Sequence, residues 1–202
     1  MYRQLNYGKL ALVPVLLTAA FVSCNHNKDL NVSSPAYYIE QSEKLFIPAA
    51  IQLPENLPAG NSRVPTYYAT GVQKYKALQK AGDPSSFEWV LTGPQADLFD
   101  ASNAKVGTHS AGPNWTISAY DSLFAQHFTP ARTTASPDGT RHVDWLLLMP
   151  KAGKAPTGIF ANVAYIQRIA TTGGKAPATL PTHAGETADV NYTAVYRFTK
   201  KN

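Results

Sequence analysis

The chain has 202 residues, of which 15% are charged, and its formal net charge is +5. Its lysines and arginines are scattered rather than grouped, which argues against a nucleic-acid-binding surface. The chain contains 11 tyrosines, and its 13 glycines and 15 prolines are spread throughout. Short apolar runs interrupted by glycine and proline predict an all-β fold, an antiparallel sandwich or barrel with long Gly/Pro loops.

The first 23 residues have the three parts of a secretory signal peptide. Arg3 and Lys9 supply the positive charge, Leu10–Val22 is an apolar run, and Ser23 is a small residue at its end. The run is too short to cross a bilayer as a helix, which takes about 20 residues. Residues 1–23 are therefore predicted to be cleaved, and the mature chain would keep 16 basic and 13 acidic residues.

Cys24 is the only cysteine and directly follows this segment. The arrangement resembles a bacterial lipobox, whose cysteine becomes the lipidated N-terminus, although Phe21 stands where leucine is usual. Because two or more acyl chains anchor a protein stably, lipid on Cys24 would hold the chain on a membrane. We therefore expect an exported lipoprotein of the bacterial cell envelope, and Asn25 favours the outer membrane over the inner. A soluble secreted protein cleaved nearby is the alternative.

The mature chain is predicted to contain a tether and one domain. Residues 24–46 are mostly polar and read as a surface tether, within which Tyr37 and Tyr38 either dock on the domain or begin a short helix. Residues 47–202 are predicted to form a single β-domain. A chain of this length buries a sufficient core without disulfides.

The strands are predicted from period-two alternation and from compact apolar runs. Turn residues at 100–103 and 120–122 indicate hairpins. The continuous run Trp145–Leu148 predicts a strand buried on both faces, and Val163–Ala170 fits a strand better than a helix. The predicted strands are Tyr67–Leu78, Phe87–Leu91, Ala96–Phe99, Lys105–Gly107, Trp115–Ala119, Leu123–Phe128, Val143–Met149, Val163–Ala170 and Val190–Thr199.

Several short motifs in a fixed order resemble a known family. They include Gly71-x-Gln73-x-Tyr75, Val106-Gly107-x-His109, Gly112-Pro113-x-Trp115, Ile166-Gln167-Arg168 and Tyr192-x-Ala194-x-Tyr196-x-Phe198. Together, over about Leu53–Phe198, they are similar to the domain of unknown function (DUF) 3455 family of bacterial and fungal secreted proteins. The resemblance implies no established activity.

The resemblance also raises the question of redox chemistry. Some fungal relatives carry dehydrogenase-like names, but this sequence has no G-x-G-x-x-G after a strand. Many members of the family carry two cysteines, at places that hold Ala77 and Leu180 in this chain. Their joint loss speaks against a redox role here.

His109 is the first candidate for a ligand contact. It lies in a glycine-rich segment, glycine lets a ligand approach the backbone closely, and histidine titrates near neutral pH. The alternative is a structural histidine that braces the segment through a hydrogen bond. Trp115 would add a flat apolar wall. The polar residues Gln73, Gln167 and Arg168 within apolar strands predict either a polar-lined pocket or a structural hydrogen-bond network.

No motif for catalysis, a cofactor or a metal stands out. The five histidines are widely spaced, Ser110 lacks a G-x-S-x-G context, and Asp97 and Asp100 would face opposite sides of a strand. We therefore expect a non-catalytic binding or structural envelope protein without cofactor or metal, whose candidate ligand is a small molecule or glycan. The alternative is an exported hydrolase-type enzyme that uses His109.

Overall fold

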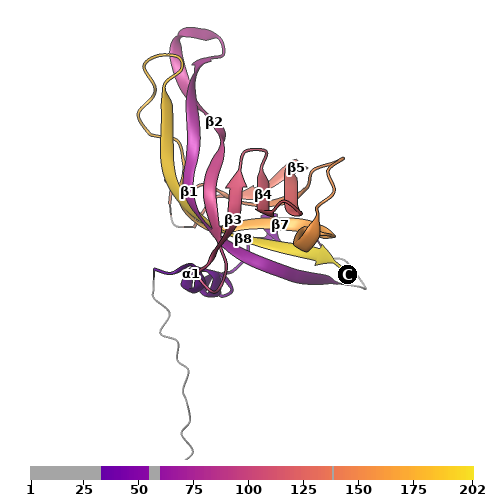
Figure 1. The fold of residues 1–202 in the computed structure, drawn as a ribbon. Coiled ribbons are helices and arrows are strands. Elements are labelled where there is room, and N and C mark those ends of the chain that lie inside the picture. The colour runs from indigo at the N-terminus through magenta and orange to yellow at the C-terminus, as the bar shows by residue number, and fades with distance from the viewer. Residues whose placement is uncertain (1–32, 55–59, 138) are drawn as a thin grey trace, which may run out of the picture.

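The structure is a computed structural model that describes residues 33–54, 60–137 and 139–202. In these residues eight antiparallel strands follow one another in chain order and close into a barrel, because the last strand pairs with the first (Figure 1). The strands are β1 (Asn61–Lys80), β2 (Asp83–Phe99), β3 (Lys105–Ser110), β4 (Asn114–Ser118), β5 (Asp121–Thr134), β6 (Trp145–Pro150), β7 (Val163–Gly173) and β8 (Thr187–Lys201).

The all-β prediction is confirmed, and the architecture is a closed barrel. The additional elements are the helix α1 (Pro35–Ser42) and two 3₁₀ turns, η1 (Ala49–Ile51) and η2 (Gly158–Phe160). The predicted signal peptide, Cys24 and the beginning of the predicted tether lie outside the described residues. No helix in the part that the structure describes is long and apolar enough to span a membrane.

Strands β1 and β2 are longer than the sequence predicts. They span 20 and 17 residues, and their hairpin projects beyond the short strands β3 and β4 (Figure 1). On the projecting part, Trp89 donates a hydrogen bond of 2.9 Å from Nε1 to the Thr179 carbonyl, which ties the loop before β8 to the hairpin. Alternation alone did not predict the extension, because Pro84, Gly93 and Pro94 interrupt the apolar pattern.

One end of the barrel interior is filled by aromatic side chains. Trp115 is fully buried and meets Phe198 edge-on, with ring centroids 5.5 Å apart and planes at 86°. Phe160 of η2 packs on Phe198 at 4.8 Å, and Tyr67 contacts both rings. Aromatic pairs favour such tilted and edge-to-face contacts, so this end forms an ordinary packed core.

A second apolar cluster lies outside the barrel, beneath the N-terminal segment. Ile39 of α1 and Ile51 of η1 cover the outward-facing side chains of β6, β7 and β8. On β6, Trp145 and Leu147 belong to this outer cluster, while Leu146 and Leu148 belong to the inner one. The prediction that this strand is buried on both faces is therefore confirmed.

Part of the predicted tether is packed on the barrel. Ser34 caps α1 by accepting a hydrogen bond of 3.2 Å from the Tyr37 backbone N–H, and Pro35 occupies the first helical turn. Tyr38 stacks on Tyr68 of β1, with ring centroids 4.9 Å apart. Both alternatives for Tyr37 and Tyr38 are therefore observed. The folded unit begins before Ile47, the expected boundary, because α1 covers apolar surface of the barrel.

Candidate functional site

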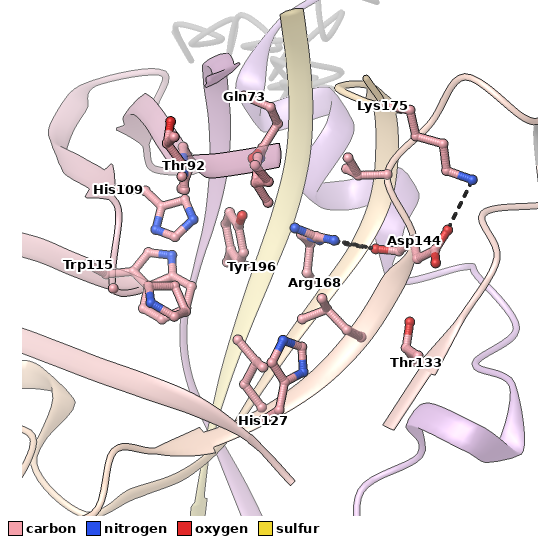
Figure 2. Close-up of a pocket in the computed structure, with 18 residues that line it drawn as sticks. Gln73, Thr92, His109, Trp115, His127, Thr133, Asp144, Arg168, Lys175 and Tyr196 are labelled. Atoms are coloured by element: carbon pink, nitrogen blue, oxygen red, sulfur yellow. Dashed lines mark hydrogen bonds and ion pairs between the residues drawn. The ribbon is translucent and has the colours of Figure 1, made fainter. Parts of the chain in front are cut away.

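The other end of the barrel interior contains a cavity of about 500 Å³ (Figure 2). The register between β7 and β8 shows where the interior changes character. Ile166 pairs with Phe198 in the filled end, whereas Arg168, one inward-facing position further, pairs with Tyr196 at the cavity. Along β7 and β8 the interior therefore changes from apolar to polar side chains within two residues.

Two irregularities in the barrel wall flank the cavity. In β2 the register shift leaves Thr92 as an extra residue between Leu91 and Gly93, and its hydroxyl donates a hydrogen bond of 3.0 Å to the Lys74 carbonyl. Gly93 has a φ of +138°, and a Cβ there would lie 2.5 Å from that of Ala111. Bulges bend a strand and are frequent beside functional sites, and both Thr92 and Gly93 line the cavity.

The second irregularity is in β5. His127 pairs with Leu148 of β6, but the next pairing joins Arg132 to Leu147, so residues 128–131 stand outside the ladder. His127 and Thr133, on either side of this segment, both line the cavity. The two displaced strand segments belong to the wall that surrounds the cavity.

His109 and Trp115 form an aromatic wall of the cavity. They are cross-strand partners in the β3–β4 hairpin, and their rings stack with centroids 4.5 Å apart and planes at 10°. The Nδ1–H of His109 donates a hydrogen bond of 2.7 Å to the Asn114 carbonyl, so Nε2 carries the lone pair. Burial lowers the pKa of His109 from 6.5 to about 3, so the imidazole is neutral at physiological pH.

Arg168 brings a positive charge into the cavity. Its Nε and Nη2 atoms donate hydrogen bonds of 3.1 and 2.8 Å to the backbone carbonyl of Asp144. The carboxylate of Asp144 instead pairs with Lys175 at 3.2 Å (Figure 2). Among the described residues no carboxylate forms an ion pair with Arg168, whose guanidinium is always charged.

Several buried polar atoms around the cavity have no partner in the described residues. Gln73 is 1% exposed, and neither its amide oxygen nor its amide nitrogen is hydrogen-bonded. The indole N–H of Trp115 is also unpaired, and the hydroxyl of Tyr196 lies beside the polar side chains of Tyr192 and Arg168. Burial raises the pKa of the Tyr196 hydroxyl, while the nearby Arg168 opposes that rise. Buried polar groups are nearly always hydrogen-bonded, so the unpaired amide of Gln73 needs an explanation; other unpaired atoms of the described residues, such as those of Trp145 and Thr199, lie away from the cavity.

Four of the five predicted site residues lie together, and one does not. Gln73, His109, Trp115 and Arg168 line the same cavity, from β1, β3, β4 and β7 respectively. Gln167 faces the outside of the barrel, where its Nε2 donates a hydrogen bond of 2.8 Å to the Ile51 carbonyl. Adjacent residues of a strand point to opposite faces, so Gln167 and Arg168 cannot share one site.

Tyr196 is a site residue that the sequence analysis did not single out. It lines the cavity, and its ring lies 4.8 Å from that of His109. The sequence placed it only in the predicted strand Val190–Thr199. The family motif Tyr192-x-Ala194-x-Tyr196 contained a signal, because tyrosine in place of phenylalanine brings a hydroxyl into the interior.

The other residues weighed for chemistry have local roles. Ser110 donates a hydrogen bond of 3.0 Å to the side chain of Asn114. Asp97 pairs with Lys105 at 2.9 Å, while Asp100 accepts hydrogen bonds within the β2–β3 turn. The described residues contain no group of three or more histidine, cysteine, aspartate or glutamate side chains placed to hold a metal ion.

A family model places the chain among known sequences. The model described as a protein of unknown function, DUF3455, matches residues 58–200. The chain belongs to this family. The DUF3455 match begins three residues before β1 and ends one residue before the end of β8, so it covers every strand that lines the cavity. Comparisons with curated proteins and with solved structures found no match. The predicted family membership is confirmed, and the family description assigns no activity.

Proposed function

We propose that this protein is a lipid-tethered binding protein of the bacterial envelope that holds a small molecule inside its barrel. The observation that carries the proposal is the cavity of about 500 Å³ at which buried polar groups lack partners. Small-molecule sites are typically concave, mostly apolar and about 300–1,000 Å³ in volume, with a few well-placed polar groups. This cavity has that size and that composition.

The unpaired amide of Gln73 is the strongest support for a bound ligand. Leaving a buried polar group without a partner costs about 1–3 kcal/mol, and an apolar residue of similar shape avoids that cost. Next to the cavity, at the filled end, the same barrel buries a cluster of apolar and aromatic side chains that includes Ile166 and Phe198. Polar residues at the cavity are therefore better explained by a ligand that completes their hydrogen bonds than by a need for stability.

The geometry favours binding over hydrolysis. A histidine that acts as general base works best with a pKa near the operating pH. The pKa of His109 is lowered to about 3, and its Nδ1–H is bonded to a backbone carbonyl rather than to a carboxylate. Ser110, its neighbour in β3, donates to Asn114 instead of to His109. His109 is thus proposed to act as a wall and brace of the cavity.

The proposal is tested with two tryptophan substitutions on the same hairpin. Leu91 is 50% exposed and lines the cavity, whereas Leu78 is 46% exposed and lies on the opposite face of the hairpin. Ligands of the full chain would first be found by a thermal-shift and native mass spectrometry screen of small molecules and short glycans. We expect Leu91→Trp to weaken their binding at least about tenfold, because the larger ring narrows the opening.

Leu78→Trp is the matched control and should bind as wild type does. Equal effects of the two substitutions would place the ligand elsewhere. A screen in which the wild-type chain is stabilised by no compound would contradict a binding function.

A further inference from the structure

The charges around the cavity indicate the chemical class of its ligand. Resting on the proposed function, we infer that the barrel binds a small amphipathic molecule with a single carboxylate group. The carboxylate pairs with Arg168 and the apolar part fills the remaining cavity.

The guanidinium of Arg168 has hydrogen-bond donors that its contact with Asp144 does not use. A guanidinium presents several N–H donors in a planar fork that matches a carboxylate. In Arg168 two nitrogens donate to one neutral acceptor, the Asp144 carbonyl, which leaves Nη1 and part of the fork unused by that contact. Arg168 is partly buried, and the acceptor of these two hydrogen bonds is neutral, so a cation partly removed from water lacks a counter-ion among the described residues.

The charged residues that line the cavity leave a net positive charge. Lys175 and Asp144 neutralise each other in an ion pair of 3.2 Å, and both side chains are about 40% exposed. His109 adds no charge at physiological pH, because burial keeps it neutral. The charge of Arg168 is therefore not offset by these neighbours, and the cavity favours an anion over a neutral or cationic molecule.

Neutral hydrogen-bonding groups lie beside Arg168 in the cavity. Figure 2 shows Gln73 and Tyr196 beside Arg168, with His109 and Trp115 further along the same wall. A carboxylate has two oxygens, each of which accepts more than one hydrogen bond. The unpaired amide N–H of Gln73 and the hydroxyl of Tyr196, which lies beside Arg168 and Tyr192, supply donors for the oxygen sites that Arg168 does not occupy.

Apolar side chains form much of the rest of the cavity lining. Val143, Leu146, Leu148 and Trp115 line the cavity as well, so a fully polar ligand would leave its own groups unpaired against them. Leu91, half exposed, extends the apolar lining onto the projecting hairpin. A neutral sugar fits this surface less well than an acid with a flat or aliphatic body.

The experiment compares ligands that differ only in charge. The probes are matched carboxylate and carboxamide pairs, 2-naphthoate with 2-naphthamide and 4-phenylbutyrate with 4-phenylbutyramide. Binding to the full chain is measured by calorimetry and by tryptophan fluorescence. We expect the acid of at least one pair to bind wild type about tenfold or more tightly than its amide, the ratio that one charge-assisted hydrogen bond provides.

Arg168→Gln should reduce that ratio to within about twofold, with the loss confined to the acid. Lys74→Gln is the control, because it removes a surface cation that pairs with Asp189 and should leave the ratio unchanged. If Arg168→Gln fails to fold, Gln73→Leu provides a second test. It should weaken acid binding while keeping or raising the melting temperature, since the native amide has no partner.

The outcomes separate the two proposals. Acid and amide binding wild type equally well, or an acid preference that survives in Arg168→Gln, would overturn the anion site while leaving the binding function standing. A lower melting temperature with unchanged acid binding in Gln73→Leu would likewise overturn the role given to Gln73. Absence of binding by every probe would contradict the anion site, while the wider compound screen then decides the binding function.

Discussion

The imidazole of His109 lies between Trp115 and Tyr196 and is 2% exposed. The sequence left a choice between a ligand contact and a brace for the hairpin. The structure shows the brace, because Nδ1–H donates to the Asn114 carbonyl, and it also shows the ring in the cavity wall. Whether the ring contacts a ligand remains part of the proposal, but its burial already has a measurable consequence.

That consequence is a loss of stability in acid. In the unfolded chain His109 binds a proton as the pH falls below 6.5, whereas in the folded protein it stays neutral down to about 3. Protons therefore favour the unfolded state within this window. Between pH 7 and pH 5, His109 should lower the free energy of unfolding by about 2 kcal/mol.

Urea unfolding of wild type and His109→Gln at both pH values measures this contribution. The glutamine variant should be less stable at pH 7, because it loses the stacked ring, but its stability should fall less between pH 7 and pH 5. A decline equal in the two proteins would show that His109 is not held neutral.

The N-terminal segment is held to the barrel through backbone carbonyls that receive side-chain donors. Arg197 of β8, 4% exposed, donates a hydrogen bond of 2.5 Å to the carbonyl of Ser42, the last residue of α1. Arg132 of β5 donates to the Gln52 carbonyl at 2.7 Å, and Gln167 to that of Ile51. The carbonyls at the end of a helix lack partners within it, so such donors complete the element.

Removing the buried donor should detach α1. Arg197→Met removes a charged donor from the Ser42 carbonyl, which then keeps only the hydrogen bond of 3.1 Å from the Leu45 backbone N–H. We expect a loss of about 1.5–3 kcal/mol in unfolding free energy, the contribution of a hydrogen bond to a charged group. Arg63→Met is the matched control, because Arg63 also pairs with Glu43 but at the surface, where such a pair contributes at most about 1 kcal/mol.

Denaturation in urea measures the stability of both variants, and hydrogen exchange over residues 35–46 reports on α1. Faster exchange there in Arg197→Met than in Arg63→Met is the expected result. Equal exchange in the two variants would mean that apolar contacts alone hold the helix.

For the whole molecule, alternation and turn residues predicted where most of the strands lie along the chain, because one face of each strand is buried. The barrel closure could not be predicted, since it depends on β8 pairing with β1 across more than 100 residues. Docking of the segment that contains Tyr37 and Tyr38 was predicted only as one of two alternatives, because the surface on which α1 packs comes from distant strands. In the site, His109 and Trp115 were predicted as candidate contacts, but their pairing in one hairpin was not, because the predicted strand ended at Gly107. The bulge at Thr92 carries no clear signal in the sequence.

The attachment of the whole barrel to a membrane through Cys24 is a prediction. Cys24 precedes the first residue of α1 by 11 residues, and an extended segment of that length reaches at most about 40 Å. Lipid on Cys24 would therefore keep α1 within about that distance of the membrane surface. In Figure 1 the β1–β2 hairpin projects on the other side of the barrel from α1.

Cys24→Ala tests the attachment, because no other cysteine can take its place. We expect the variant to leave the detergent phase in a phase-partitioning assay, or to accumulate unprocessed, while Ser23→Ala keeps the small residue before the cysteine and stays membrane-bound. Intact mass spectrometry should find the wild-type mature chain beginning at Cys24 with acyl chains attached. A mature mass without lipid, together with unchanged partitioning of Cys24→Ala, would show that the protein is exported and held by some other means.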